Sequence, residues 1–171
     1  MTSFATDAIA RAHVAERGLG ELYYFCQTAA PRLRPDGSVF VGADGTASLY
    51  GPGHGDLLAT IRSSGTLSEL VRRRVRSIFV SNVDNLGATI DPVIIGHHLA
   101  KGRPMSAEVT QKMRSASGAW DKGGAPAMVD GRTQLVEGFR FPEGFAQETL
   151  PDFSTNNMIF DAPTYISAVS K

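Results

Sequence analysis

The sequence of 171 residues has a single cysteine, a single tryptophan, no net charge and no long apolar run. The lone Cys26 excludes an internal disulfide and a cysteine-based zinc framework, and it fits a reducing compartment. The 17 basic and 17 acidic residues cancel, which argues against binding to nucleic acid or to a membrane surface through bulk charge. The apolar runs are too short to span a bilayer, and no leader pattern begins the chain. We therefore expect a soluble, cytoplasmic protein.

The chain length suits about one domain with a sizeable core, and helical and strand patterns alternate along it. Apolar periodicity predicts a helix over residues 6–17 that ends at Gly18, and two helices split at residues 63–65. Short apolar runs rich in β-branched or aromatic residues predict strands. The expected helices cover residues 6–17, 57–61 and 67–75, and the expected strands cover residues 21–27, 39–41, 47–50, 77–80 and 105–110. Cys26, within residues 21–27, is expected to be a small core residue.

Residues 77–80 form a compact apolar run between polar residues, which indicates a central parallel strand. Asp91 is a suitable N-cap, and Pro92 suits the first position of the helix that follows. This strand-turn-helix unit would place Asn82 and Asp84 at the carboxyl end of a parallel strand. Ligands bind at that edge in open α/β sheets.

The last third of the chain predicts a hairpin and a polar turn. Two apolar stretches, residues 127–129 and 133–136, flank Asp130 and Gly131, which suit a two-residue hairpin turn. Farther on, Phe153 and residues 158–160 flank a polar segment that we expect to be a turn. The sequence has no repeat and no low-complexity tract, so we expect no linker and no second domain.

Two polar turns rich in glycine are the strongest functional signals in the sequence. They occupy residues 51–56 and residues 81–88, and the second follows the predicted strand 77–80 directly. Turns of this kind bring backbone and a carboxylate close to a phosphorylated ligand, so they indicate a nucleotide site. Taken alone, a glycine-rich turn is more often only a turn, and Asp84 fits the cap of a turn or helix equally well.

Several motifs in order resemble the UTP–glucose-1-phosphate uridylyltransferase family, also called UDP-glucose pyrophosphorylases. Pro-Gly-His-Gly-Asp at residues 52–56 repeats a family signature, and residues 80–91 are similar to its Val-Ser-Asn-Ile-Asp-Asn-Leu-Gly-Ala-Thr-x-Asp segment. The remaining matches are Phe4 with its preceding residues, Phe25 and Gln27 with Pro31-Arg32, Glu108-Val109-Thr110 with Lys112, Lys122-Gly123-Gly124, Leu135-Val136-Glu137 and Thr155-Asn156-Asn157. Because the resemblance runs through almost the whole chain, it is far more specific than any single motif.

The resemblance implies an α/β fold with a Rossmann-like, GT-A-like mixed sheet flanked by helices. It also implies an activity in which UMP passes from UTP to glucose 1-phosphate, giving UDP-glucose and pyrophosphate. Such a reaction aligns two anions and neutralises the charge that develops, for which Mg²⁺ bound by one or two carboxylates is well suited. The expected cofactor is therefore Mg²⁺, and the expected partners are UTP and glucose 1-phosphate.

Roles for individual residues follow from the same resemblance. Gln27 and Gly53 would contact the uracil base, because an amide offers both a donor and an acceptor and glycine allows close approach. Asp84 would bind the metal and the nucleotide. The residues expected to bind the sugar phosphate are His54, Asn82, Gly124, Glu137 and Asn156.

The sequence also departs from the family pattern. In the family a glycine-rich triphosphate loop precedes the Met-Asn-Ser-Phe strand, and a C-terminal β-helix domain that often mediates association follows the catalytic domain; neither occurs within residues 1–171. Inside the matched region, Thr2 and Ser154 replace asparagines, and Trp120-Asp121 stands near the usual Ala-Asp. We therefore expect residues 1–171 to be a partial catalytic domain, incomplete at both ends, with little or no turnover by itself. A longer form could associate as a homo-oligomer.

Two other functions remain open from the sequence. One is a pyrophosphorylase for another UDP-sugar, although relatives acting on acetamido sugars tend to carry Asn-Gly-x-Gly-Gly where this chain has residues 52–56. The other is a remnant that binds sugar nucleotides without catalysis.

Overall fold

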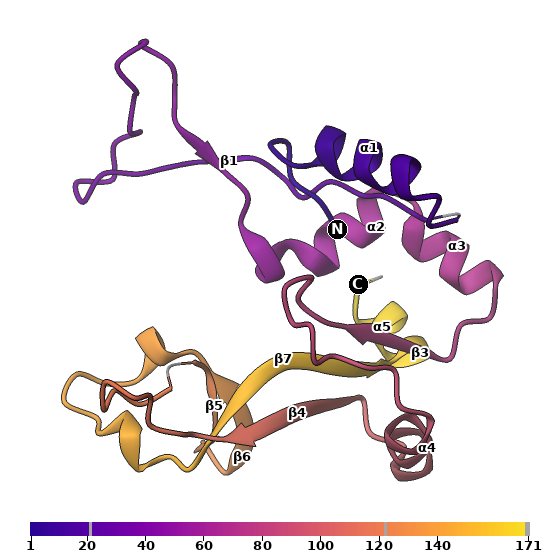
Figure 1. Cartoon of the computed structure of the whole chain (residues 1–171), viewed down its shortest axis with the longest axis vertical. Helices are drawn as coiled ribbons and strands as arrows, with labels where there is room; N and C mark the ends of the chain where they lie inside the picture. Colours follow the sequence, from indigo (N-terminus) through magenta and orange to yellow (C-terminus); the bar gives the residue numbers. More distant parts are fainter. Residues whose placement is uncertain (21, 122, 170–171) are drawn as a thin grey trace. The chain divides into compact units, whose positions relative to one another are not determined.

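The computed structural model of the chain describes residues 1–20, 22–121 and 123–169. These residues form two compact units, which we call unit 1 (residues 1–75 and the end of the chain from Ile166) and unit 2 (Arg76–Tyr165). Figure 1 follows the course of the chain. The elements up to residue 75 are α1 (Asp7–Arg17), β1 (Ala30–Pro31), β2 (Leu49–Tyr50), the 3₁₀ helix η1 (Gly53–Asp56), α2 (Leu57–Ser63) and α3 (Thr66–Arg72). Those that follow are β3 (Ser77–Val80), α4 (Pro92–Lys101), β4 (Met105–Gln111), β5 (Ala125–Val129), β6 (Arg132–Val136), η2 (Gly138–Arg140), η3 (Gln147–Thr149), β7 (Asp152–Asp161) and α5 (Ala162–Val169).

The helices predicted in unit 1 are confirmed. α1 ends where Gly18 adopts a left-handed conformation with φ 61°, which glycine reaches without the steric cost that a Cβ imposes. α2 and α3 are separated at Gly65, whose φ is 77°. Ile61 and Leu67 are buried on these two helices, whereas α1 buries none of its side chains. The packing of unit 1 therefore depends on α2 and α3 more than on α1.

The strand expected over residues 21–27 is not a regular strand. Glu21 lies outside the described residues, and the rest of the segment forms one parallel bridge, between Cys26 and Thr2. Cys26 is exposed, so its expected place in the core is wrong. An aromatic and apolar run predicts burial only if another layer covers it, and Leu22 and Tyr23 are also exposed here.

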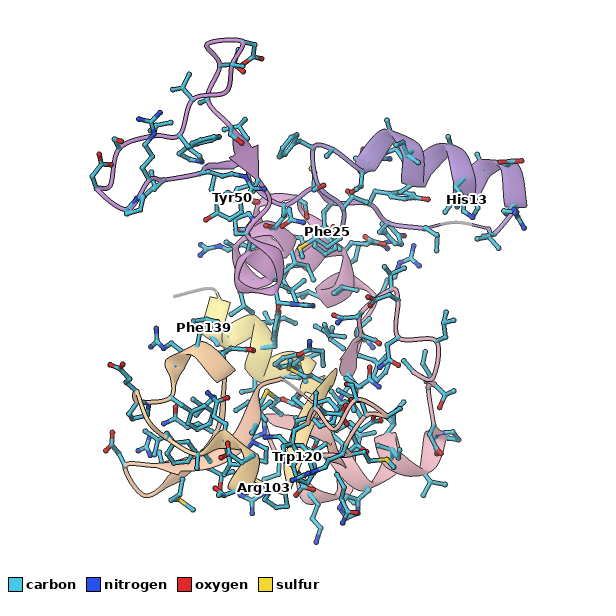
Figure 2. All side chains as sticks on the ribbon, turned by 60° about the vertical axis from the view of Figure 1, so that its left-hand side comes forward. His13, Phe25, Tyr50, Arg103, Trp120 and Phe139 are labelled. Carbon is cyan, nitrogen blue, oxygen red and sulfur yellow. The ribbon has the colours of Figure 1, made fainter. Side chains whose placement is uncertain are left out.

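Residues 30–50 form an arm of two successive hairpin-like loops. β1 pairs with β2 at the base of the arm, and each loop is closed by one antiparallel bridge, Leu33 with Val39 in the first and Val41 with Ala47 in the second. The expected strands 39–41 and 47–50 are therefore reduced to isolated bridges and the two residues of β2. Side chains are sparse along this arm, which carries Tyr50, and crowd together around the sheet of unit 2 (Figure 2). Without a covering layer the arm cannot bury its apolar residues.

Unit 2 is built on a sheet of three strands in the order β3-β7-β4, in which every pair is antiparallel. The predicted strands 77–80 and 105–110 are confirmed as β3 and β4. However, the expectation of a central parallel strand is wrong within the described residues, where β3 lies at the sheet edge beside β7. An apolar run indicates that a strand is shielded from water but does not determine the direction of its neighbour. That neighbour arrives from much later in the sequence.

The polar turn expected between Phe153 and residues 158–160 is also wrong, because β7 runs through it as one long strand. The strand is irregular at this point: Ala107 pairs with Met158, but Val109 pairs with Ser154. Residues 155–157 therefore lie opposite Glu108 alone, in a wide bulge, which we call the β7 bulge. Asn156 within it has φ 62°, a left-handed conformation that asparagine tolerates better than most residues.

The local predictions for the rest of unit 2 are confirmed. Asp91 caps α4, its Oδ1 accepting hydrogen bonds from the backbone N–H groups of Val93 (2.7 Å) and Ile94 (3.4 Å). β5 and β6 form the expected hairpin, with positive φ at both Asp130 (50°) and Gly131 (73°) as its two-residue turn requires. Among the described residues, no helix is long and apolar enough to cross a membrane.

Candidate functional site

The predicted site residues fall into both units, and those of unit 1 lie where two distant segments meet. Gln27 follows the bridge to Thr2, and its backbone N–H donates to the Thr2 carbonyl at 2.9 Å. Its side-chain Oε1 accepts a 2.7 Å hydrogen bond from the backbone N–H of Gly53. The structure thus brings together two residues that the family resemblance assigned to one nucleotide base.

Glycine at position 51 makes this approach possible. A Cβ added at Gly51 would lie 2.6 Å from both Cδ and Oε1 of Gln27, closer than non-bonded atoms can come. Gly53 has a different requirement, because its φ of 76° strains any residue with a side chain. The two glycines therefore serve Gln27 in separate ways: Gly51 leaves room for the amide, and Gly53 offers its N–H.

Asp56 ends the Pro-Gly-His-Gly-Asp segment and fastens it to the residue after Gln27. Its Oδ2 accepts hydrogen bonds from the backbone N–H of Thr28 (2.5 Å) and from the Thr28 hydroxyl (2.9 Å). The bond from the Thr28 N–H is the main reason why the pKa of Asp56 lies below its usual value. The charged Asp56 carboxylate thus links the two segments through hydrogen bonds. His54, by contrast, lies within η1 with an exposed side chain.

In unit 2, Asn82 and Asp84 lie on the loop that follows β3. Backbone hydrogen bonds from Asn85 to Asn82 (3.1 Å) and from Leu86 to Asp84 (3.0 Å) shape the loop into consecutive turns. Asp84 is exposed, and its neighbour Val83 is 100% exposed. Asp84 therefore lies beyond the carboxyl end of β3, as predicted, although β3 pairs with an antiparallel neighbour, and its carboxylate is exposed to solvent.

The donor set around Asp84 limits the kind of metal site it can form. Among the described residues, no three His, Cys, Asp or Glu side chains gather as a group that could hold a metal ion. A closed protein cage such as a structural zinc site is therefore absent from the described part of the chain. Mg²⁺ commonly binds one or two carboxylates together with phosphate oxygens and water, and a single exposed carboxylate fits that mode.

Gly124 and Glu137 meet beside the first strand of the hairpin. A Cβ added at Gly124 would lie 3.3 Å from Oε1 of Glu137, so the backbone of the buried Gly124 adjoins that carboxylate closely. The Gly124 carbonyl also accepts a 2.7 Å hydrogen bond from the backbone N–H of Ser154, at the start of the β7 bulge. Three predicted sugar-binding residues, Gly124, Glu137 and Asn156, are thus carried by connected segments. The matching Lys122 lies outside the described residues.

A polar network that the sequence analysis did not identify connects these segments. Its centre is Asn157, which is 4% exposed. Asn157 Oδ1 accepts hydrogen bonds from the Ser81 hydroxyl (2.6 Å) and from Asn85 Nδ2 (3.2 Å), and Asn157 Nδ2 donates to Glu108 Oε1 (3.2 Å). Asn157 and Glu108 stood in the matched motifs, but nothing in the sequence showed that they would meet.

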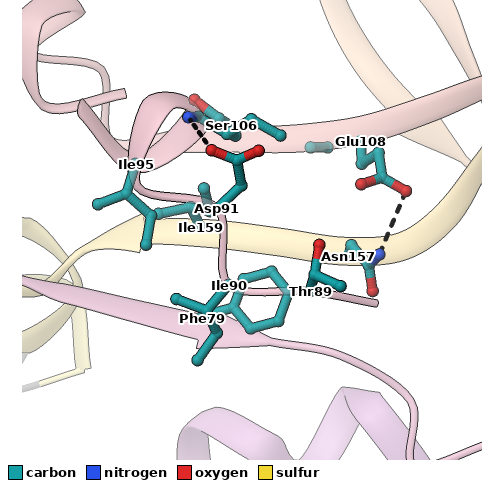
Figure 3. A pocket seen from close by; sticks show the side chains of 11 residues that line it. Phe79, Thr89, Ile90, Asp91, Ile95, Ser106, Glu108, Asn157 and Ile159 are labelled. Carbon is teal, nitrogen blue, oxygen red and sulfur yellow. Dashed lines mark hydrogen bonds between the residues drawn. The ribbon is translucent and has the colours of Figure 1, made fainter. Parts of the chain in front are cut away.

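A cavity of about 120 Å³ opens beside this network (Figure 3). Apolar side chains, among them Phe79, Ile95 and Ile159, form much of its lining, and Glu108 and Asn157 border it with their hydrogen bond to each other. Walls of this kind offer few partners to the phosphates of a nucleotide. We therefore place the candidate site on the exposed loops and not in this cavity.

Comparison with known proteins identifies related sequences and folds. The UTP–glucose-1-phosphate uridylyltransferase family matches residues 1–169. The UTP–glucose-1-phosphate uridylyltransferase of Saccharomyces cerevisiae is 34% identical over 142 residues, which cover 78% of this chain and 28% of the yeast protein. The match therefore spans less than a third of that relative's length.

Solved structures confirm the α/β nucleotidyltransferase fold class. A Trypanosoma brucei protein described as UDP-glucose phosphorylase superposes with a TM-score of 0.84 at 27% identity, over 98% of this chain and 39% of that one. A variant of Leishmania major UDP-glucose pyrophosphorylase in complex with UDP-glucose superposes with a TM-score of 0.79 at 26% identity, over 98% and 40%. Both likenesses extend across nearly all of the chain.

Proposed function

This chain belongs to the UTP–glucose-1-phosphate uridylyltransferase family, and we propose that the protein that carries it transfers UMP from UTP to glucose 1-phosphate. A phosphate oxygen of glucose 1-phosphate attacks the α-phosphorus of UTP, and the bond from that phosphorus to the bridging oxygen breaks. UDP-glucose forms and pyrophosphate leaves. Because neither substrate becomes attached to the protein, the chain's task is to align the substrates and offset their charge.

The observation that carries the proposal is the hydrogen bond between Gln27 and Gly53. It holds the Gln27 amide against the glycine-rich segment that also bears His54. An amide whose position is fixed can offer a donor and an acceptor to the edge of a uracil ring, and Gly53 leaves that edge unobstructed. This arrangement supports the binding of a uridine nucleotide.

Sugar and metal binding complete the proposal. In unit 2, Glu137 and Asn156 are apt partners for hexose hydroxyl groups, the Gly124 backbone lies beside Glu137, and Asn82 would contact the hexose or its phosphate. His54, in unit 1, would contact the sugar phosphate. Asp84 would hold Mg²⁺ together with phosphate oxygens. The bound Mg²⁺ would supply positive charge to the phosphates.

The test is to purify the longest natural protein that contains residues 1–171 and to incubate it with UTP, glucose 1-phosphate and Mg²⁺. UDP-glucose and pyrophosphate should form in equal amounts, and EDTA should stop the reaction. Residues 1–171 alone should give little or no turnover. Failure of the full protein to form UDP-glucose under these conditions would refute the proposal.

The alternatives are separated in the same assay. Replacing glucose 1-phosphate by N-acetylglucosamine 1-phosphate tests the pyrophosphorylase for another UDP-sugar, and a clear preference for that substrate would favour it. A protein that binds UDP-glucose in a calorimetric titration but forms none would be the non-catalytic remnant.

A cytoplasmic location remains part of the proposal, supported by the lone Cys26, and so does homo-oligomer formation by a full-length form.

A further inference from the structure

We propose that Asn157 is a positioning residue that holds the loop bearing Asp84 and the β7 bulge bearing Asn156 in one fixed arrangement. The inference rests on the proposed function, because it assigns a task to a side chain that would touch neither substrate nor metal. It depends on contacts within unit 2 alone.

The hydrogen bonds of Asn157 enclose the segment that carries Asn82 and Asp84. Ser81 and Asn85 flank this segment, and both donate to the same atom, Asn157 Oδ1, at 2.6 Å and 3.2 Å. The ends of the segment are therefore fixed to one point while its middle is exposed. The backbone hydrogen bonds within the loop set its local turns, and Asn157 fixes these turns to the sheet.

The other half of the Asn157 amide fixes the β7 bulge. Nδ2 donates to Glu108 Oε1 at 3.2 Å, and the same oxygen accepts from the Thr155 hydroxyl at 2.8 Å. Asn85 Nδ2 also reaches the Thr155 carbonyl at 3.4 Å. Glu108 thus anchors residues on both sides of Asn156 to β4, which stabilises the left-handed backbone of Asn156 (φ 62°).

The amide of Asn157 satisfies both halves of this network. Position 157 needs an acceptor for Ser81 and Asn85 and, at the same time, a donor for the carboxylate of Glu108. Aspartate would keep the acceptor but place a second carboxylate against Glu108. Because Asn157 is almost fully buried, that unmatched pair would be costly and would displace one of the two segments.

The decisive variants are Asn157→Asp, Glu108→Gln and the two combined, made in the full protein that contains this chain. Glu108→Gln alone keeps an acceptor for Asn157 and Thr155, so its activity should stay near wild type. Asn157→Asp should lower kcat/KM about 10-fold or more and raise the Mg²⁺ concentration needed for half-maximal rate, as loss of partners behind a metal site commonly does. In the double variant the new amide at position 108 can donate to the new carboxylate at position 157. Both kcat/KM and the Mg²⁺ concentration needed for half-maximal rate should then return to within about threefold of wild type.

Two further measurements and a control variant distinguish a local displacement of the loop from a general loss of folding. UDP-glucose binding in EDTA, measured by titration, should weaken in Asn157→Asp and recover in the double variant. Amide hydrogen exchange should accelerate in residues 81–86 of the single variant only. The matched control is Asp161→Asn on the same strand, where Asp161 Oδ2 accepts from the Thr164 backbone (2.9 Å) and hydroxyl (2.6 Å) far from this network; it should leave kcat/KM unchanged.

The outcomes separate this inference from the proposed function. If the wild-type protein forms UDP-glucose and Asn157→Asp does so equally well at the same Mg²⁺ requirement, the positioning role is refuted while the function stands. A loss that the double variant fails to restore would also refute it. If the wild-type protein neither forms nor binds UDP-glucose, the proposed function itself is refuted.

Discussion

Gln27 and Gly53, 26 positions apart in the sequence, are joined by a 2.7 Å hydrogen bond from the Gly53 backbone N–H to Gln27 Oε1. The bond leaves the amide N–H₂ of Gln27 available to a ligand. Because Gly51 lies directly against the amide, the position of Gln27 is set by contact on one side and by a hydrogen bond on the other. One substitution tests whether the amide contacts a ligand, and a second tests the steric constraint at Gly51.

Replacing Gln27 by glutamate tests whether the side chain reads a base. A carboxylate still accepts from the Gly53 N–H, so the fold should persist, but it cannot donate to a base carbonyl and it repels the phosphates. We expect KM for UTP to rise about 10-fold or more, measured from initial rates in the full protein. Gln134→Glu on the exposed face of β6 introduces the same charge and should change KM little. An unchanged KM for UTP in Gln27→Glu would contradict the assignment.

Replacing Gly51 by alanine tests the steric constraint. The new methyl group would lie 2.6 Å from the Gln27 amide, so the amide must move away from Gly53. UTP binding should weaken about 10-fold while the unfolding midpoint falls modestly, measured by titration and by urea denaturation. Gly55→Ala is the matched control, because a Cβ there meets no atom within 4 Å. Equal effects from the two alanines would show that the contact with Gln27 is not the cause.

Signals confined to a few neighbouring residues predicted their structures well. The cap at Asp91 and the turn at Asp130-Gly131 were identified correctly, because a helix start and a two-residue hairpin depend on local hydrogen bonds and on φ. The end of α1 at Gly18 follows the same rule. In the candidate site, the family resemblance assigned Gln27 and Gly53 to the same base, but it did not predict the hydrogen bond between them.

Features that depend on distant segments were missed. The direction of β3 is set by its pairing with β7, and the exposure of Cys26 by the absence of a covering layer in the described part of the chain. Asn157 binds residues from the loop after β3 and from β4, which approach one another only in the folded sheet. Residue types in one segment carry no information on such meetings, so a long polar stretch in β7 resembled a turn.

Replacing Asp84 by asparagine tests the predicted metal ligand. The amide keeps the size of the side chain but removes the charge that would attract Mg²⁺, so kcat should fall about 100-fold or more at fixed Mg²⁺. Raising the Mg²⁺ concentration should recover part of the rate, which initial-rate titrations would measure. Asp130→Asn, at a hairpin turn whose left-handed backbone suits asparagine, is the control and should remain active. Full activity of Asp84→Asn would remove Asp84 from the site.

Acid titration tests the cluster of charges on α3. The pKa of Glu69 is lowered from 4.5 to about 2. The largest cause is its hydrogen bond from Arg72 (2.6 Å), and the second is its hydrogen bond from Arg73 (2.5 Å). A carboxyl group whose pKa is lower in the folded state stabilises that state above its unfolded pKa. This contribution is therefore present at neutral pH and declines as the pH falls from 4.5 towards 2.

Glutamine at position 69 should thus lower the urea midpoint slightly at neutral pH, since both arginines are exposed to solvent and such pairs are weak. The difference between wild type and Glu69→Gln should shrink through this acidic window and vanish near its lower end, because the protonated carboxyl and the amide are then equally neutral. Glu143→Gln, at an exposed position of unit 2, is the control and should give a smaller and flatter difference. A difference that grows with acidification would reverse the sign of this linkage and show that Glu69 is not held by its arginines.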